Sequence, residues 1–210
     1  MTPDRGTMGL LLLAGAVLAA CGGDATREGA SEEAQASIVA YDTAPSAEAV
    51  ARARAAANGL GQELQAKLFA ALDAGGPRRA VAICADSAQA WTARQAKEDV
   101  YVRRVSLRVR NPLNRPDADE ARELRRLDSL HRAGALPAEV VRVRGTERGE
   151  RLVEYVRPIL VQERCLSCHG ARERLAPGVR ELLATRYPSD SATGYEAGDL
   201  RGMLSVRVRP

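Results

Sequence analysis

The sequence EVVRVRGTERGERLVEYVR, residues 139–157, decides the fold class that this chain can adopt. Apolar and polar residues alternate over 139–144 and again over 151–157, and Gly145 and Gly149 bound the segment between them. Alternation with a period of two is typical of strands that bury one face, and a glycine-bearing turn between two such runs is typical of a β-hairpin. The stretch therefore predicts two antiparallel strands.

Two further runs predict strands before and after this hairpin. Apolar residues alternate with polar ones over 100–109, and the alternation slips at Arg103 and Arg104, which predicts a β-bulge there. Near the end of the chain, over 203–209, every second residue is again apolar. About four strands in a meander are therefore expected.

Helical periodicity covers much of the remaining chain. Apolar residues recur at helical spacing after Ser46 until Gly75 and Gly76, and Pro77 suits the first turn of a new helix. Asp117 is a good N-cap for another helix. The expected helices cover residues 46–74, 77–97, 117–132 and 178–186. Together these elements predict an α+β fold, with the N-terminal helices packed on one side of an antiparallel sheet of about four to five strands.

The first twenty residues have the features of an export signal. An uncharged apolar run over 8–20 is shorter than the ~20 residues that a membrane-spanning helix needs. It ends in LAAC at 18–21, which resembles the lipobox of bacterial lipoproteins and implies cleavage before Cys21 and acylation of its thiol. The alternative is an ordinary secretory signal that leaves Cys21 as a free thiol. The expected segments are a signal peptide over 1–20, a flexible tether over 21–45 and a folded domain over 46–210.

Export also indicates where the protein works and what it meets. Lipidation of Cys21 predicts a location on the periplasmic side of the cell envelope, anchored in the outer or the inner membrane. The formal net charge is +4, and arginine supplies nearly all of the positive charge. An exported protein does not normally meet nucleic acid, so anionic lipids, an anionic cofactor or an acidic partner are expected instead.

The pentapeptide Cys165-Leu166-Ser167-Cys168-His169 follows the predicted hairpin directly. Two thiols separated by two residues can reach the two vinyl groups of one porphyrin, and the adjacent histidine then lies under the iron as its proximal ligand. A redox-active CxxC and half of a zinc site are the alternatives, but the chain has no second CxxC, no histidine pair and no βαβ context. The motif therefore predicts one covalent c-type haem.

The count of cysteines leaves Cys84 without a partner. The chain has four cysteines, of which Cys21 would be acylated and Cys165 and Cys168 would be bonded to haem. A lone exposed thiol would be oxidised outside the cytoplasm, so Cys84 is expected to be buried, paired with another chain or bound to the iron. The residues alone leave the sixth iron ligand open among Cys84, His131, Met203, Lys67 and Lys97.

Four separated motifs resemble a family of bacterial domains of unknown function that bind c-type haem and were first described in cyanobacteria. The motifs are AIC at 82–84, RRVSLRVRNPLNRPD at 103–117 with Glu120 after it, CLSCHG at 165–170 and GDLRG at 198–202. The resemblance covers residues 46–210 and implies a PAS-like sensor fold. It also implies an axial pair in which His169 is the proximal ligand and Cys84 the distal one.

Three arginines of the 103–117 motif are candidates for contact with the haem. Arg104, Arg108 and Arg110 could pair with the haem propionates, or they could face solvent on a strand. Asn111 and Pro112 are expected to shape a turn. The sequence therefore leaves both roles possible for the three arginines, and it predicts a structural role for Asn111 and Pro112.

The predicted ligands indicate what kind of haem protein this is. An imidazole and a thiolate together leave no vacant position on ferric iron, and the thiolate stabilises Fe(III) and so lowers the potential. This disfavours a peroxidase, which needs a vacant position, and enzymatic activity in general. A thiolate that is displaced on reduction or by a gas predicts a redox or gas sensor with a separate signalling or redox partner. The alternative is a membrane-tethered, cytochrome-like electron carrier.

Overall fold

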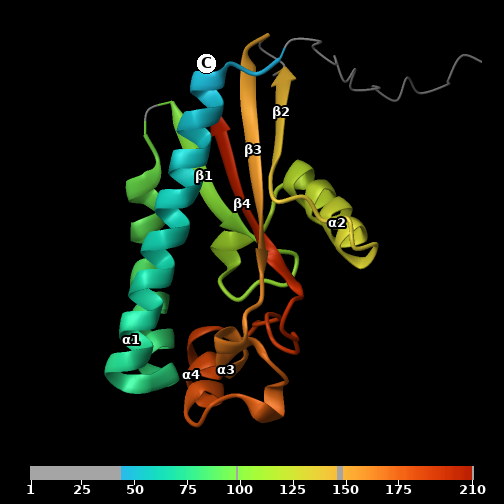
Figure 1. Cartoon of the computed structure of the whole chain (residues 1–210). Coiled ribbons are helices and arrows are strands. Elements are labelled where there is room, and N and C mark those ends of the chain that lie inside the picture. The colour runs from blue at the N-terminus through green and yellow to red at the C-terminus, as the bar shows by residue number, and fades with distance from the viewer. Residues whose placement is uncertain (1–43, 98, 146–148, 210) are drawn as a thin grey trace, which may run out of the picture. The chain divides into compact units, whose positions relative to one another are not determined.

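The computed structural model describes residues 44–97, 99–145 and 149–209 (Figure 1). The expected signal peptide over 1–20 and the expected lipidation of Cys21 lie outside these residues, as does nearly all of the expected tether. Within the described part of the chain, no helix is long and apolar enough to cross a membrane. The described residues cover almost the whole of the expected folded domain.

The predicted hairpin forms β2, Val140–Gly145, and β3, Arg151–Leu160. β4, Leu200–Val208, pairs with β3, and β1, Val100–Val105, pairs with the other side of β4. The strand order is β1-β4-β3-β2, and every pairing is antiparallel. The strands β2, β3 and β4 thus form the expected meander, whereas β1 joins the sheet at the edge beside β4.

The prediction of a bulge at Arg103 and Arg104 was wrong. β1 pairs with β4 without a break in register. Val102 belongs to the core on one face of the sheet, and Val105 belongs to the core on the other face. The slip in the alternation therefore marks a strand that carries apolar residues on both faces, and it does not mark an inserted residue.

The long element α1, Ala47–Gln95, consists of two helices joined at a break. Ser46 caps its start, because its hydroxyl accepts a hydrogen bond from the Ala49 N–H at 3.1 Å. Gly75 and Gly76 leave helical geometry, and the φ of 70° at Gly76 is one that glycine adopts without strain. The chain reverses there, and the two halves run side by side (Figure 1). The two predicted N-terminal helices are confirmed.

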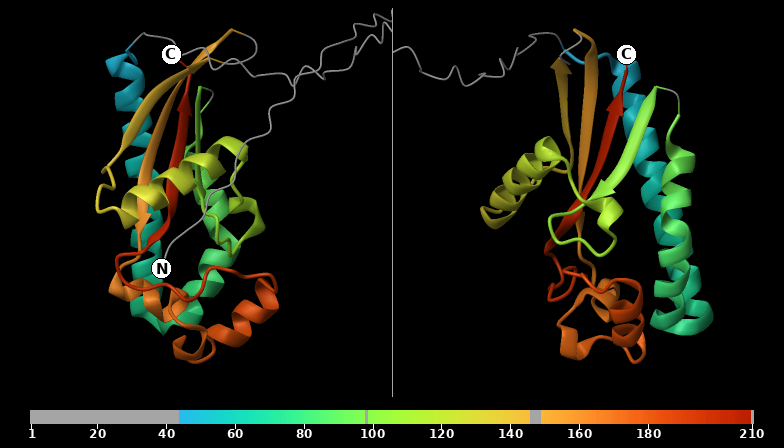
Figure 2. Two further views of the ribbon diagram at one scale, coloured as in Figure 1. Left: turned by 90° about the vertical axis from the view of Figure 1, so that its right-hand side faces the viewer. Right: turned by 180° about the vertical axis from the view of Figure 1, so that it is seen from behind.

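Helices cover both faces of the sheet (Figure 2). The two N-terminal helices pack on one side as predicted, but the sequence did not predict a helix on the other side. α1 packs on one face, where Trp91 and Val206 are among the buried residues of the main core. α2, Ala118–Arg132, packs on the other face through Leu124 and Leu127. Arg142, Arg144 and Glu154 of the hairpin therefore lie on the face that α2 covers.

Short elements gather at the end of the sheet where β3 leaves it and β4 begins (Figure 1). They are η1 Pro112–Asn114, η2 Glu163–Cys165, α3 Leu166–His169, η3 Arg172–Arg174 and α4 Val179–Arg186. α4 packs against the second half of α1, where Val179 and Leu183 contact Val81. The α+β fold with a four-stranded antiparallel sheet confirms the expected PAS-like architecture.

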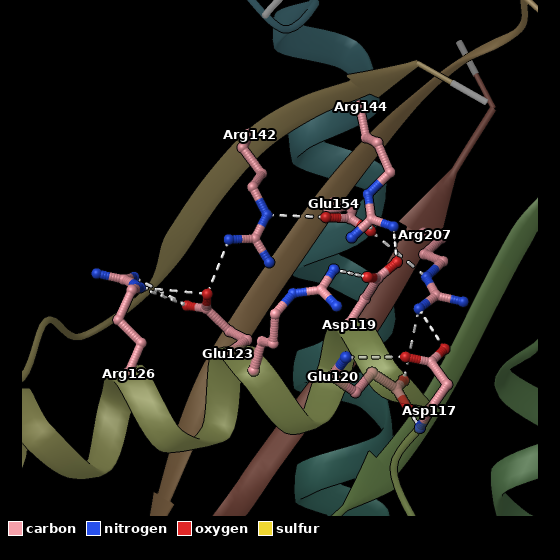
Figure 3. A network of polar contacts seen from close by, with 10 residues as sticks. Asp117, Asp119, Glu120, Glu123, Arg126, Arg142, Arg144, Glu154 and Arg207 are labelled. Carbon is pink, nitrogen blue, oxygen red and sulfur yellow. Dashed lines mark hydrogen bonds and ion pairs between the residues drawn. The ribbon is translucent and has the colours of Figure 1, made fainter. Parts of the chain in front are cut away.

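Ion pairs, as well as apolar contacts, hold α2 on the sheet (Figure 3). The buried Glu123 accepts hydrogen bonds from Arg126 of α2 and from Arg142 of β2. Burial acts to raise the pKa of Glu123, but the hydrogen bonds from these two guanidinium groups hold it below its ordinary value. The equally buried Glu154 pairs with Arg142, Arg144 and Arg207.

Replacing Glu123 by glutamine is expected to destabilise the fold by about 1–3 kcal/mol near neutral pH, because the arginines lose a buried acceptor. Since the folded-state pKa is lowered, the stabilisation is complete above the unfolded pKa of about 4.3 and is lost as the pH falls through the folded-state value. The difference in melting temperature between wild type and E123Q should therefore shrink in acid. The control is E173Q at an exposed position. A difference that stays constant with pH would contradict this account.

Candidate cofactor-binding site

A cavity of about 650 Å³ lies between α1, the end of the sheet and α3. Its volume falls in the range of ~300–1,000 Å³ that is typical of small-molecule and cofactor sites. Leu64, Leu68 and Phe69 of α1 contribute to its apolar side. The predicted attachment cysteines and axial ligands line the same cavity: Cys84, Cys165, Cys168 and His169.

The helical turn at the CxxCH motif presents its functional side chains together. η2 follows the end of β3, and the Cys165 N–H donates to the Gln162 carbonyl oxygen at 2.8 Å. α3 continues from there, so Cys168 and His169 follow Cys165 by three and four residues on helical backbone. Residues at these spacings lie on one side of a helix. Both thiols and the imidazole therefore face the same cavity.

The imidazole of His169 is held in the tautomer that can bind a metal. Its Nδ1 lies 2.7 Å from the carbonyl oxygen of Ala192. A carbonyl only accepts, so Nδ1 carries the proton and Nε2 keeps its lone pair. Burial lowers the pKa of His169 well below its ordinary value, and the nearby Arg110 and Arg201 lower it further. The ring is therefore neutral at pH ~7, and the Ala192 carbonyl fixes its orientation.

Cys84 lines the cavity from the second half of α1. Burial raises the pKa of its thiol, and the positive charge of Arg104 acts in the opposite direction. Burial also raises the pKa of Cys168, against the opposing effect of its contact with the Ser167 hydroxyl. Both groups are therefore thiols and not thiolates at neutral pH before any ligand binds.

The other candidates for the sixth iron ligand lie away from the cavity. Met203 is on the opposite face of β4, in the core beneath α2. His131 is in the last turn of α2, on that same side of the sheet. Lys67 and Lys97 are exposed and are not part of the cavity wall. Among the five residues considered for this position, only Cys84 lines the cavity.

Arg104 and Arg110 both reach the cavity, but their surroundings differ. Arg110 pairs with Asp190 at 3.1 Å and donates to the carbonyl oxygen of Cys168 at 2.6 Å. It thus fastens the CxxCH segment to the loop that supplies the carbonyl for His169. The side chain of Arg104 has no hydrogen bond or ion pair within the described part of the chain. Its guanidinium is therefore available to a ligand.

The third candidate arginine, Arg108, lies outside the cavity wall. Its guanidinium donates to the carbonyl oxygens of Ser191 and Thr193. It also lies 4.1 Å from the centre of the Tyr195 ring, a cation–π arrangement. In this structure Arg108 therefore shapes the loop over 191–195.

Three further arginines line the cavity that the sequence did not single out as binding residues: Arg157 of β3, Arg164 of η2 and Arg201 of β4. Arg201 donates to the Ser106 hydroxyl at 2.7 Å, and burial lowers its pKa to about 10, against the opposing effect of Tyr195. The GDLRG motif contains Arg201 but does not show where its side chain points. Arg157 is one of several arginines in the hairpin, and only the sheet pairing places it in the cavity.

Comparisons with known proteins show the family to which the chain belongs. A family model described as Tll0287-like matches residues 23–209. The comparison with curated proteins found no match. The crystal structure of the cyanobacterial heme-protein Tll0287 is similar, with a TM-score of 0.52 and 26% sequence identity over 79% of this chain and 97% of that chain. The family resemblance noted in the sequence is thereby confirmed, and the chain belongs to the Tll0287-like family.

Proposed function

We propose that this chain binds one haem, attached through Cys165 and Cys168, with His169 and Cys84 as its axial ligands. The observation that carries the proposal is the position of His169, whose Nδ1 lies 2.7 Å from the Ala192 carbonyl oxygen, on the wall of a cavity that three cysteines also line. Membership of the Tll0287-like family and similarity to a haem protein support the same cofactor. When bound, haem supplies one-electron and gas-binding chemistry.

The polarity of the cavity fits this cofactor. Apolar side chains of α1 line one part, and arginines line another. Among the described residues, no aspartate or glutamate lines the cavity. A haem is a flat apolar ring with two carboxylates on one edge, so it matches both the apolar surface and the unbalanced positive charge.

The motif cysteines would attach the cofactor by addition. Each thiol would add across one vinyl double bond, so that sulfur would bond to one vinyl carbon and the thiol hydrogen would pass to the other. No group leaves, and no net oxidation occurs. The reaction requires reduced cysteines on one side of the ring, and Cys165 and Cys168 are free thiols that line one cavity.

The position of Cys84 supports a sensing role. It lies on the second half of α1, where Val81 packs against Val179 and Leu183 of α4. A thiolate that leaves the iron on reduction or on gas binding would free this helix to shift against α4, as a population shift between ligated and released states. The domain would then act as a redox or gas sensor that passes its state to a separate signalling or redox protein.

The lipid anchor is a second part of the proposal, and it rests on the sequence LAAC at 18–21. Acylation of Cys21 would hold the domain at the periplasmic face of the outer or inner membrane. The segment between Cys21 and Ser46 would serve as the tether.

Export of the full chain in cells with haem-maturation machinery tests both parts. We expect haem that survives denaturation, a low-spin ferric spectrum and a midpoint potential below zero millivolts. A midpoint well above zero without a change of ligands would favour the electron carrier, and a haem-free protein would refute the proposal. Fractionation of the same cells should place wild type, but not the Cys21→Ala variant, in the membrane fraction.

A further inference from the structure

Positive charge on the cavity wall is only partly balanced by the protein. Five arginines line the cavity: Arg104, Arg110, Arg157, Arg164 and Arg201. Arg110 pairs with Asp190, and Arg164 pairs with Asp73. Arg201 is held by the Ser106 hydroxyl and by the Arg108 carbonyl. Within the described ranges, Arg104, Arg157 and Arg201 have no carboxylate within ion-pair distance.

Two of these three arginines, Arg104 and Arg157, lie in one row across the sheet. Arg104 of β1 is opposite Leu204 of β4, and Leu204 is opposite Arg157 of β3. Residues in one cross-strand row point to the same face, so both arginines point toward α1. Two strand spacings put their backbones about 10 Å apart. The next row on this face, Val102, Val206 and Tyr155, is buried in the core. The arginine row therefore forms the boundary between the core and the cavity.

The guanidinium of Arg157 is held in place by α1. It donates to the side-chain oxygen of Asn58 and, at 3.1 Å, to the carbonyl oxygen of Ala57. A Cβ at Gly61 would lie 2.5 Å from its Nη2, so a side chain there would displace the guanidinium. A guanidinium has five N–H donors, and those that α1 does not use remain available to the cavity.

Arg104 needs an anionic partner more than Arg157 does, because no group among the described residues binds its guanidinium. Its side chain is half-buried in the cavity wall, where partial loss of solvent disfavours the charged form and lowers its pKa. Buried charges in proteins are normally paired, because an uncompensated one is costly. A ligand carboxylate would supply the missing charge.

We propose that Arg104 and Arg157 form a two-point site for the two propionate carboxylates of the haem. The inference rests on the proposed function. The porphyrin carries its vinyl groups and its propionates on opposite edges. Cys165 and Cys168 lie beyond the end of β3, in η2 and α3, whereas the arginine row lies on the sheet (Figure 1). Attachment at the cysteines would therefore direct the carboxylates toward the arginines.

The test compares haemin with haemin dimethyl ester, which lacks the two charges, on the full chain made without maturation machinery. Wild type should bind haemin at least about tenfold more tightly than the ester, since charge-assisted pairs are lost. The double variant R104Q/R157Q should bind the two equally. R125Q, at an exposed position on α2 across the sheet, should keep the preference of wild type.

Other variants keep the test decisive if the double variant fails to fold. R104K/R157K retains both charges and should retain a preference for haemin. G61A should weaken the preference through Arg157 alone. Equal binding of both probes by wild type, or a preference that depends on Arg104 alone, would overturn the two-point site. Wild type that acquires no covalent haem with maturation machinery would instead overturn the proposed function.

The assembled haem protein gives an independent readout. Removing two positive charges near the haem favours the ferric state, so R104Q/R157Q should lower the midpoint potential. We expect about a tenfold change in the ratio of reduced to oxidised protein at a fixed potential, which is about 59 mV for a one-electron couple. A midpoint equal to that of wild type in the loaded double variant would overturn the inference.

Discussion

Replacing Cys165 and Cys168 together by alanine is expected to abolish the haem that survives denaturation, a loss of essentially the whole covalent signal. The two thiols come from the turn at η2 and α3 and can react with neighbouring vinyl groups of one ring. Cys84 lines the cavity from α1 and cannot replace that pair. Haem staining on a denaturing gel and the mass of the intact chain measure the loss.

Controls separate attachment from ligation in this experiment. Ser167 lies between the two cysteines, donates to the Arg164 carbonyl at 3.1 Å and lines the same cavity. S167A should therefore keep the stain at the wild-type level. The double variant should still bind haemin reversibly, because His169 and Cys84 remain. Staining of C165A/C168A at the wild-type level would refute the covalent assignment.

Local patterns in the sequence predicted most of the fold. The hairpin over 139–157 and the break at Gly75 and Gly76 depend on nearest neighbours, so alternation and turn chemistry were sufficient to find them. The covering of the second sheet face by α2 was missed. The reason is that Glu123 and Glu154 are charged, which in a sequence indicates exposure, yet both are buried among arginines.

The candidate site also contains residues that the sequence predicted and residues that it did not. The CxxCH motif could be found in the sequence because its three functional residues share one helical turn. The sequence could not predict that the Ala192 carbonyl orients His169, because any residue can supply a backbone oxygen. The role of Arg157 depends on the register that places it in one row with Arg104. Pairing between strands far apart in sequence carries no local signal.

Replacing Cys84 by alanine is expected to remove the thiolate features of the ferric spectrum and to raise the midpoint potential. Loss of an anionic donor destabilises Fe(III), and axial ligands set haem potentials over a range of about 800 mV. A rise on the order of 100 mV is therefore expected. Absorption spectra and a reductive titration of the loaded protein are the measurements. S87A, on the same helix, is the matched control, and thiolate bands that persist in C84A would show that another residue binds the iron.

The same variant decides whether release of Cys84 is the sensing event. If reduction or a gas displaces the thiolate in wild type, the reduced spectrum of wild type should match that of reduced C84A, while the ferric spectra differ. Carbon monoxide should then bind both reduced proteins at similar rates, because neither has a distal protein ligand to displace. If the reduced spectra differ and carbon monoxide binds wild type much more slowly, the thiolate stays on the iron, and the helix that carries Cys84 cannot transmit a signal by ligand release.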